Sequence, residues 1–506
     1  MGIARFGRVA SALLVASLAL AAPAGAQNLE DTDLDGLPNV WETNGVDTDG
    51  NGRIDLDLPA FGANPNHRDL FVEIDSMSGH QLDNAAIEAI VTSFRNSPVP
   101  NGDGRRGINL HVDNGPGSLM NPDTGARWGS RSEARSDMQH RDVLGSFASG
   151  GAYDWTEFDG LKRANFRPER SVAFRYALSI HQYGSATNDS SGLARGIPAF
   201  DFFVSLGRDC GGGVDCTVGG VGGVAGTFMH ELGHTVGLLH GGNQDINYKP
   251  NYLSVMNYFW QFPGLKRRAE SRGGIYDYSR TGPASFQGTT GVVDENALRE
   301  GIGVTATGSR HNFASARLCR FPQRGGGREV LIERLNSAVD WGCNNDIRDI
   351  AFSSDITDDG RVDRLEPFYD WGVFNSRTAS WPRPVGSLER RAPQPRRTPN
   401  FDRDATIRRL RNAAQVAVAD EKRPKLRIRR LPVGGRRVRV TVVATDADGL
   451  DKLVVTVGRR TRTVIAAPNK ADEGLRATVT VRRGRRVKAV VFDRATNQRA
   501  TTVRVK

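Results

Sequence analysis

The chain has 506 residues, a net charge of +11, 25% charged residues and 38% hydrophobic residues. At about 100–200 residues per domain, this length excludes a single ordinary domain and predicts two to four. The composition is typical of a globular protein. No segment after residue 26 is apolar enough to span a bilayer, which excludes a protein built of membrane-spanning helices.

The first 26 residues have the pattern of a secretory signal peptide. Arg5 and Arg8 precede an apolar run over residues 9–22, and the small residues at 24–26 form a cleavage signal. The alternative, a membrane anchor, is disfavoured because the apolar run is shorter than the ~20 residues of a spanning helix. We therefore expect cleavage after Ala26 and a secreted, extracellular protein.

Residues 27–66 are dense in Asp, Asn and Gly and are predicted to form an acidic calcium-binding segment. Segments 31–42 and 47–55, and a third at 355–366, have the spacing of the twelve-residue loop whose oxygen atoms bind calcium. The predicted ligands are Asp31, Asp33, Asp35, Leu37, Asn39 and Glu42 in the first loop, Asp47, Asp49, Asn51, Arg53 and Asp55 in the second, and Asp355, Thr357, Asp359, Arg361, Asp363 and Glu366 in the third.

The match is complete in the first and third loops and partial in the second, where Leu58 replaces the final Glu. Leu37, Arg53 and Arg361 stand at the seventh position, where only the backbone carbonyl binds. A single partial match would indicate a solvated acidic turn, but two complete loops favour calcium. Two or three structural Ca²⁺ ions are therefore expected, with the role of stiffening segments that have little apolar core.

Residues 67–380 are predicted to form an α+β domain. Residues 69–75 and 200–206 are apolar runs typical of strands, and apolar residues at 86, 87, 90, 91 and 94 indicate a helix over 84–94. Residues 227–239 indicate another helix after a glycine-rich stretch. A strand, a helix, further strands and a helix in this order favour an α+β core.

Residues 230–240 read His-Glu-Leu-Gly-His-Thr-Val-Gly-Leu-Leu-His and predict a zinc site. His230 and His234 are four residues apart, so on a helix they share one face and can bind one ion. Gly237 can adopt the backbone angles that end the helix, and the turn brings in His240 as the third ligand. Three protein ligands leave one position for water, as a catalytic zinc requires, and Glu231 can reach that water. The alternative is three histidines packed in a helix without a metal.

These eleven residues match the signature of the metzincin metalloproteases, and the chain resembles that family. Metzincins also have a methionine turn beneath the metal, and Ser254-Val-Met256-Asn-Tyr258 looks like that turn. The resemblance implies a twisted sheet with an active-site helix, a supporting role for Met256, and Tyr258 as a further zinc ligand, as in astacins and serralysins. Taken alone, Met256 could be an ordinary core methionine and Tyr258 a packed aromatic. Gly241 departs from the named subfamilies, so the subfamily stays open.

The function implied by this resemblance is that of a secreted zinc metalloendopeptidase with one catalytic Zn²⁺ and protein or peptide substrates. In such an enzyme the metal activates a water, Glu231 is the general base, and Tyr258 stabilises the oxyanion. One alternative is a non-catalytic, calcium-stabilised extracellular binding protein on a metzincin scaffold. Another is a zinc hydrolase that cleaves a non-peptide bond.

The four cysteines agree with export. An even number in an exported chain predicts two local disulfides, Cys210 with Cys216 and Cys319 with Cys343, although four cysteines allow three connectivities. A zinc site at Cys210 and Cys216 is less favoured, because neither pair has the two-residue spacing of a zinc ribbon.

The C-terminal part differs in composition from the rest. Residues 381–424 are rich in Arg and Pro and read as a linker. Residues 425–506 alternate β-branched and polar side chains, which predicts a small β-sandwich. Residues 421–506 contain 24 Lys and Arg against 7 Asp and Glu, a surplus of 17. The signal peptide contributes +2 through its two arginines. Subtracting 17 and 2 from the total of +11 leaves residues 27–420 with a net charge of −8.

This basic domain could bind an anionic cell-surface polymer, or it could be a structural module with a solvated basic face. Nucleic acid is not expected as a partner, because binding usually adds aromatic residues for stacking and Phe492 is the only one in this domain.

Overall fold

The computed structural model of the chain describes residues 30–188, 190–207, 220–266, 274–280, 291–300, 304, 314–320, 328–334, 338–344, 348–375, 425–434, 437–445, 450–458, 460–465, 475–493 and 498–505. The predicted signal peptide, the predicted linker 381–424 and the pair Cys210 and Cys216 lie outside the described residues.

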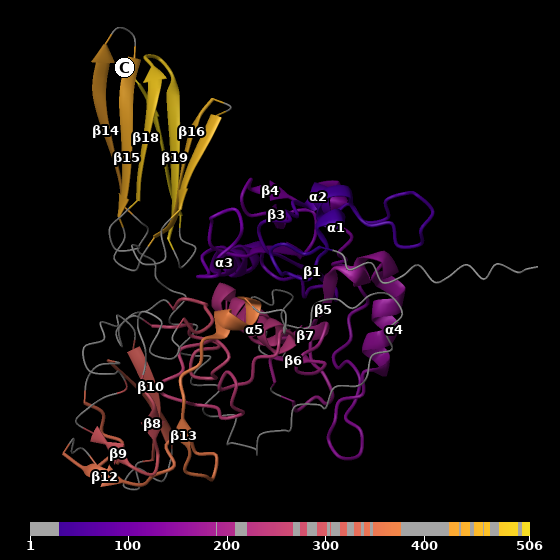
Figure 1. Cartoon of the computed structure of the whole chain (residues 1–506), viewed down its shortest axis with the longest axis vertical. Coiled ribbons are helices and arrows are strands. Elements are labelled where there is room, and N and C mark those ends of the chain that lie inside the picture. The colour runs from indigo at the N-terminus through magenta and orange to yellow at the C-terminus, as the bar shows by residue number, and fades with distance from the viewer. Residues whose placement is uncertain are drawn as a thin grey trace, which may run out of the picture.

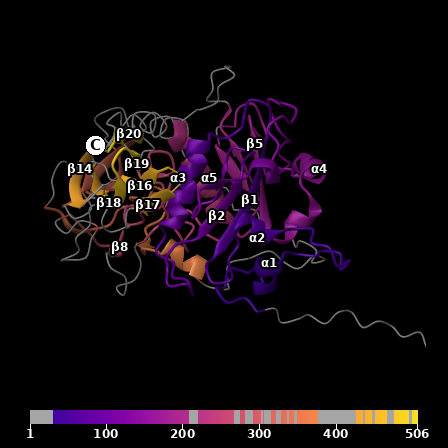
Figure 2. The same cartoon turned by 90° about the horizontal axis from the view of Figure 1, so that it is seen from above.

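The largest sheet among the described residues has five strands in the order β2-β1-β5-β7-β6 (Figure 1 and Figure 2). Its strands are Asn109–Asp113 (β2), Asp69–Ser76 (β1), Phe174–Ile180 (β5), Asp201–Ser205 (β7) and Gly192–Ala194 (β6). The first four run parallel, with Leu70 beside Leu110 and Phe71 beside Phe174, whereas β6 is an antiparallel edge strand. Every residue of the four parallel strands is buried, as expected for a parallel sheet that is covered on both faces.

Helices cover the two faces of this sheet. Helices α3 (Asn84–Arg95) and α5 (Gly220–Thr235) lie side by side on one face, and α4 (Thr156–Asn165) lies on the other (Figure 2). Leu70 and Val72 of β1 pack in one apolar cluster with α3 and α5, whereas Phe71 packs in a second cluster with Phe158 of α4. This division follows from the strand geometry, because successive side chains of a strand point to opposite faces.

The strands predicted over 69–75 and 200–206 and the helix predicted over 84–94 are confirmed as β1, β7 and α3. Helix α3 begins where the Asp83 side chain accepts a hydrogen bond from the Ala85 backbone amide at 2.8 Å, which is an N-cap. The helix predicted over 227–239 is α5, but it begins earlier, at Gly220, and ends earlier, at Thr235. The predicted end was too late because Gly237 leaves the helical conformation with φ +101°.

The acidic segment at the N-terminus shares its core with the sheet. It contains the short helices α1 (Asn39–Asn44) and α2 (Leu58–Phe61). Leu37, Leu56 and Phe61 pack in the same apolar cluster as Phe71 of β1. The two predicted calcium loops in this segment are therefore attached directly to the sheet.

Two glycines of α5 allow the helix to pack closely against the segment that contains Met256 and Gln261. A Cβ atom at Gly226 would collide with the backbone carbonyl of Gln261, and one at Gly233 would overlap Sδ of Met256. A backbone oxygen in a packed turn cannot swing away as the end of a flexible side chain can. Gly226 is therefore the more restrictive of the two positions.

Gly226→Ala is expected to lower the free energy of unfolding by about 1–3 kcal/mol, because overpacking forces backbone to shift. Gly160 in α4 is the matched control: a Cβ there meets no atom within 4 Å. Gly160→Ala is expected to be neutral or to stabilise by about 0.5–1 kcal/mol. Urea unfolding followed by tryptophan fluorescence checks both, since residues 425–506 contain no Trp. Equal effects at the two positions would contradict the close approach.

Several short strands outside the main sheet form antiparallel pairs. They are β3 (Leu119–Asn121) with β4 (Ala126–Arg127), β8 (Val293–Asp294) with β13 (Arg364–Leu365), β9 (Leu298–Arg299) with β12 (Ile350–Phe352), and β10 (Ala314–Arg320) with β11 (Arg328–Arg334). The short helices η1 (Gly129–Arg131), η2 (Pro168–Val172) and η6 (Asp370–Asn375) are 3-10 helices. Of these, η6 places Trp371 and Phe374 in the cluster beneath α3 and α5.

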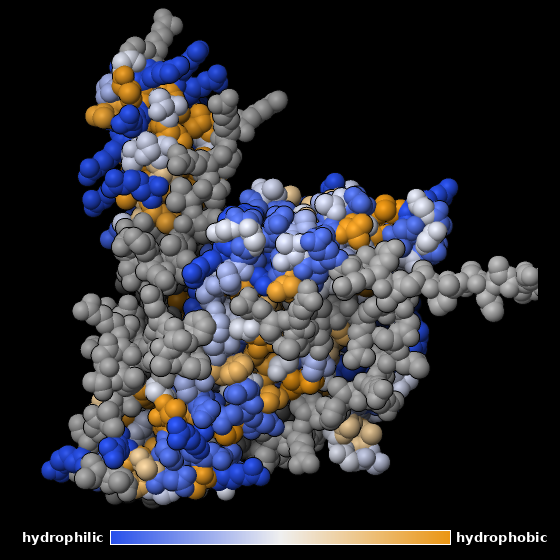
Figure 3. Space-filling view, viewed as in Figure 1, coloured by the Kyte–Doolittle hydropathy of each residue, from blue (hydrophilic) through white to orange (hydrophobic). Residues whose placement is uncertain are grey.

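Towards the C-terminus two antiparallel sheets pack face to face. Their orders are β14-β15-β18 and β17-β16-β19-β20, with strands Lys425–Gly434 (β14), Arg437–Thr445 (β15), Leu450–Val457 (β16), Arg460–Ile465 (β17), Leu475–Arg482 (β18), Arg486–Asp493 (β19) and Gln498–Arg504 (β20). Val440 of β15 and Val491 of β19 are fully buried in one shared cluster. Arg437 and Arg439 alternate with the buried valines and are exposed. The positive charge of this region thus lies on its outer face, where Figure 3 shows hydrophilic side chains.

Across the part of the chain that the structure describes, no helix is long and apolar enough to cross a membrane.

Candidate metal centre

Helix α5 and the turn after it bring His230, His234 and His240 together. The ring centroids of His230 and His234 are 4.7 Å apart, and that of His240 lies 5.2 and 4.9 Å from them. One potential ligand atom from each ring lies within 4.8 Å of the others. The structure thus gathers the three histidines predicted as zinc ligands, two from one helix face and one from the turn.

The turn that brings in His240 is fixed by the end of α5. The amide of Leu238 donates to the Gly233 carbonyl and the amide of Gly237 to the His234 carbonyl, both at 3.0 Å. This pair of bonds with a left-handed glycine is the Schellman motif, which satisfies the last carbonyls of the helix and reverses the chain. A Cβ at Gly237 would meet open space, so its positive φ and not crowding requires glycine there.

The hydrogen bonds of His230 and His234 fix which nitrogen carries the proton. Nδ1 of His230 lies 2.9 Å from the Val255 carbonyl oxygen, and Nδ1 of His234 lies 2.7 Å from that of Leu238. Because a carbonyl only accepts, both Nδ1 atoms must donate. Burial lowers the pKa of both rings, that of His234 to about 3, so both are neutral at pH 7 and keep their lone pairs on Nε2.

Those two Nε2 atoms lie 3.2 Å apart. Two neutral acceptors that face each other at this distance repel, unless a cation lies between them. Zinc with Zn–N distances of 2.0–2.1 Å and tetrahedral angles would separate two ligating nitrogens by about 3.3 Å. The residues present therefore fit a zinc ion.

A carboxylate lies behind the third ring. Oδ1 of Asp245 is 3.8 Å from Nδ1 of His240, and the ring lowers the pKa of that carboxyl. A carboxylate beside a metal-ligating histidine is a common device for orienting the ring.

The predicted methionine turn lies against the helix that carries the histidines. Met256 is fully buried, and the carbonyl of Val255, the residue before it, accepts the His230 proton. Met256 also occupies the space that a side chain at Gly233 would need. Met256 thus packs against Gly233 of α5, and the backbone carbonyl of the residue before it holds the His230 ring, while the supporting role of Met256 at a metal stays a prediction.

Asp370 anchors this turn and was not predicted. Its carboxylate accepts hydrogen bonds from the Tyr252 hydroxyl at 2.8 Å, the Ser254 hydroxyl at 2.5 Å and the Ser279 amide at 2.9 Å. Burial raises its pKa to about 7. Since Asp370 is more than 100 residues from the turn in sequence, no local spacing could have identified it.

Tyr258 lies beside the histidines. Its ring centroid is 5.4 Å from that of His230 and 4.7 Å from that of His240, and the side chain is half-buried. Its backbone amide donates to Oδ1 of Asn247 at 3.1 Å, which fixes the chain at this residue. Tyr258 therefore borders the three histidine rings, and its role as a further zinc ligand stays a prediction.

Glu231 is buried against the edge strand β6. A Cβ at Gly192 would lie 2.7 Å from Cγ and 2.8 Å from Oε1 of Glu231, so this carboxylate fits only because residue 192 is glycine. Burial raises the pKa of Glu231 to about 8, opposed by a backbone hydrogen bond at Ala194. The sequence did not indicate that Gly192 makes room for Glu231, because a single glycine in a strand has no distinctive pattern.

The three acidic loops share one backbone turn. Gly36, Gly52 and Gly360, each the sixth residue of its loop, have φ between +84° and +89°. In each loop the amide of this glycine donates to the first aspartate of the same loop, at 3.0, 2.7 and 2.8 Å. The loops differ in whether the remaining carboxylates converge.

The first loop gathers buried carboxylates, and some of their oxygen atoms lack hydrogen-bond partners. Its Asp33, Asp35 and Glu42 are buried, and Asp69 at the start of β1 joins Asp35 and Glu42 in one group. Both carboxylate oxygens of Glu42 and one of Asp33 have no hydrogen-bond partner. Burial and mutual repulsion raise the pKa of Asp33 to about 7 and of Glu42 to about 9. Such a cluster could hold a cation, and Asp69 is a candidate ligand that the loop pattern did not include.

The second and third loops are less complete. Asp47, Asp49 and Asp55 form a group, but they are not buried. Among the described residues the third loop forms no such group around Asp355, and Glu366 is exposed. Instead Glu295, which the sequence did not indicate, accepts the amide protons of Ile356, Thr357 and Asp363 at 2.8, 3.1 and 2.7 Å. Calcium in all three loops stays a prediction.

Both predicted disulfides also stay predictions. Cys210 and Cys216 are outside the described residues. The sulphur of Cys343 lies 3.9 Å from the carbonyl oxygen of Leu318, the residue before Cys319. This position in sequence and space is compatible with the pairing of Cys319 and Cys343.

No protein-family model and no curated protein matches the chain. Two similar solved structures are crystal forms of wild type OgpA from Akkermansia muciniphila. The first is 9% identical, covers 87% of this chain and 92% of that chain, and has a TM-score of 0.20. The second is 7% identical, covers 87% and 93%, and has a TM-score of 0.15. With TM-scores this low, the likeness carries no argument about the fold or the activity.

Proposed function

We propose that the chain is a secreted zinc metalloendopeptidase of the metzincin type. The observation that carries this proposal is the pair of buried, neutral histidines whose Nε2 lone pairs face each other at 3.2 Å, with a third histidine beside them. Glu231 adds a carboxylate next to His230 in sequence, which a purely structural metal site does not need.

A zinc ion held by His230, His234 and His240 would lower the pKa of a bound water and polarise the scissile carbonyl. The chain's own part is proton transfer and orientation. Glu231 would accept the proton of the attacking water and pass it to the leaving amine. Its buried position suits this role, because a carboxylate whose pKa is raised towards neutrality binds a proton more readily than an exposed one.

The domain plan belongs to the same proposal. The sheet with α5 on one face supports a metzincin-like α+β catalytic domain over 67–380, and the two C-terminal sheets support a β-sandwich over 425–506. Export, the structural calcium ions and an anionic surface partner for the basic domain are further parts of it. Cleavage specificity and subfamily are left open.

Casein digestion by purified protein, with its zinc content measured in parallel, tests this function. We expect one catalytic zinc per chain, digestion that stops on removal of zinc by a chelator, and recovery when zinc is added back in calcium-containing buffer. Zinc binding without digestion of casein or of a peptide library would favour the alternative, a non-catalytic binding protein on the same scaffold.

Tyr258→Phe is expected to lower kcat by about 10²-fold with little change in KM, because one donor to the developing oxyanion is lost. Zinc content should be unchanged, since the three histidines remain. Tyr248→Phe is a matched control, because that ring packs 6.0 Å from Tyr258 and is not assigned a role in the reaction. Equal kcat values for Tyr258→Phe and the unaltered protein would assign Tyr258 to packing only.

A further inference from the structure

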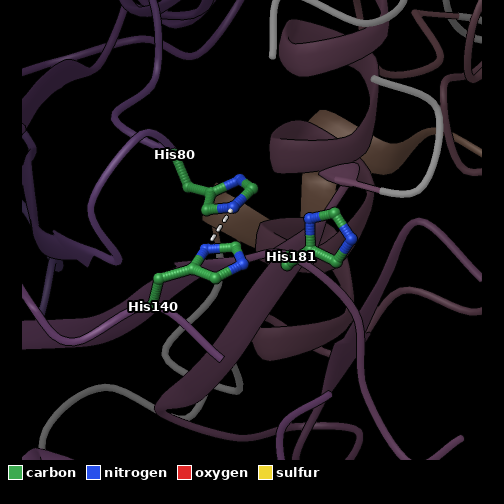
Figure 4. A group of neighbouring side chains, drawn as sticks. All are labelled: His80, His140 and His181. Atoms are coloured by element: carbon green, nitrogen blue, oxygen red, sulfur yellow. Dashed lines mark hydrogen bonds between the residues drawn. The ribbon is translucent and has the colours of Figure 1, made fainter. Parts of the chain in front are cut away.

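Three more histidines converge outside the candidate metal centre. His80, His140 and His181 form a cluster in which one potential ligand atom from each ring lies within 4.8 Å of the others (Figure 4). The rings of His80 and His140 are stacked with centroids 5.1 Å apart, and the His181 ring stands at 68° to that of His80 at 5.2 Å. Their sequence positions have no motif spacing, so only the fold brings them together.

The main sheet positions two of them. His80 follows the end of β1 and His181 follows the end of β5, and these two strands are parallel neighbours. The Ser179 hydroxyl donates to the His80 carbonyl at 2.6 Å, which joins the two strand ends. At the end of the next strand, β7, a Cβ at Gly207 would overlap Nδ1 of His181 and lie 2.5 Å from its Cα. Glycine at 207 therefore leaves room for the His181 ring.

The third histidine lies on a segment that is held at both ends. The amide of Ser78 donates to the Met138 carbonyl at 2.8 Å, and the amide of Leu144 donates to the Gln182 carbonyl at 2.8 Å. His140 lies between these two fixed points and is exposed. Backbone hydrogen bonds thus tie its segment to the chain that carries His80 and to the chain that carries His181.

The nitrogen atoms of the cluster are arranged as ligands. Nε2 of His140 lies 3.1 Å from Oδ1 of Asp142, so this nitrogen donates and Nδ1 keeps a lone pair, 3.2 Å from Nε2 of His80. Nδ1 of His181 is buried and has no hydrogen-bond partner. The Asp142 carboxylate stands where a carboxylate orients a metal-ligating histidine.

We propose that His80, His140 and His181 form a second zinc site, which ties the ends of β1 and β5 to the 138–144 segment. Neutral imidazoles are ligands for zinc, and three of them leave the fourth tetrahedral position to a water from the solvent that His140 reaches. The site uses none of the residues of the candidate metal centre, and its zinc binding does not depend on the proposed peptidase activity.

A simple hydrogen bond between His80 and His140 is the competing explanation. It would use one lone pair of His140, but it gives no reason for His181 to bury an unpartnered Nδ1 beside the pair. A metal ion uses all three rings, and the two explanations differ in zinc stoichiometry.

Untagged protein is titrated with Zn²⁺ in calcium-containing buffer, and bound zinc is counted by mass spectrometry. We expect two zinc ions per chain in the unaltered protein and one in His140→Ala, which should still digest casein at its normal rate. Arg141→Ala is the matched control, because Arg141 is the neighbouring, half-buried residue of the same segment and offers no imidazole, and this variant should bind two.

His230→Ala combined with His234→Ala should also bind one zinc ion, and added zinc should raise its melting temperature unless His140→Ala is present as well. If the double variant does not fold, the comparison of His140→Ala with Arg141→Ala still decides the question. Equal zinc content in the unaltered protein and His140→Ala, whether one or two ions, would overturn the second site. Loss of casein digestion in the double variant alone concerns the peptidase and not this cluster.

Discussion

Glu231→Gln is expected to reduce kcat/KM for peptide hydrolysis by about 10²–10⁴-fold, while zinc content stays at the level of the unaltered protein. Gln has nearly the same shape and fits the same space beside Gly192, but it cannot accept the proton of the attacking water. General-base catalysis typically contributes 10²–10⁴-fold, so the loss is large on the scale of single substitutions. Stopped assays with a fluorogenic peptide and zinc analysis of the same sample measure both quantities.

The control for this variant is Glu157→Gln in α4. Glu157 is an exposed carboxylate that contacts Arg141 and lies on the opposite face of the sheet from α5. Its substitution should leave kcat/KM within about twofold of the value for the unaltered protein. Glu157 is a surface residue outside the core and the candidate metal centre, and such substitutions usually have small effects. Undiminished hydrolysis in Glu231→Gln would remove Glu231 as the base. Loss of zinc together with activity would instead give the carboxylate a role in holding the metal site together.

The parts of this molecule that the sequence predicts are those in which the functional residues are neighbours in the chain. His230, His234 and His240 lie within eleven residues, so helix geometry alone places two of them together and Gly237 accounts for the turn. The helix over 84–94 was predictable for the same reason, because its apolar period is local. The start of α5 was missed because Gly220, Gly222 and Gly223 are poor helix formers, and packing of the helix overrides that preference.

Residues that meet only through the tertiary fold could not be predicted in this way. Asp370 reaches the methionine turn from more than 100 residues away, and Asp69 joins the first acidic loop from the start of a strand. Glu295 is similarly remote from the third loop that it binds. The cluster of His80, His140 and His181 is the clearest case, because parallel strands bring their ends together whatever the sequence distance between them.

Calcium is expected to stabilise the protein through the first acidic loop, by about 1–3 kcal/mol between calcium-free buffer and 10 mM calcium with zinc present throughout. This estimate combines dissociation constants of about 10⁻⁴–10⁻³ M, typical of extracellular modules, with the mass-action relation. The loop shares its core with the main sheet, so its stability should couple to the unfolding of that sheet. Urea unfolding followed by tryptophan fluorescence at both calcium concentrations measures the difference.

Glu42→Gln is expected to change the free energy of unfolding in opposite directions with and without calcium. With calcium the variant is expected to be less stable than the unaltered protein, because a charged ligand at the last loop position is lost. Without calcium it is expected to be more stable at pH 7. The buried Glu42 carboxyl has a folded pKa raised from 4.5 to about 9, so the folded state binds a proton that the unfolded state releases. The carboxyl therefore opposes folding progressively as pH rises above 4.5, and Gln removes this cost.

Below about pH 4.5 this advantage of Gln in calcium-free buffer should vanish, since the carboxyl is then protonated in both states. Asp49→Asn in the second loop is the control, because Asp49 is exposed and its replacement should change stability little in either buffer. A calcium response that survives in Glu42→Gln but is lost in Asp49→Asn would move the stabilising ion from the first loop to the second. A response lost in neither would exclude both loops as its source.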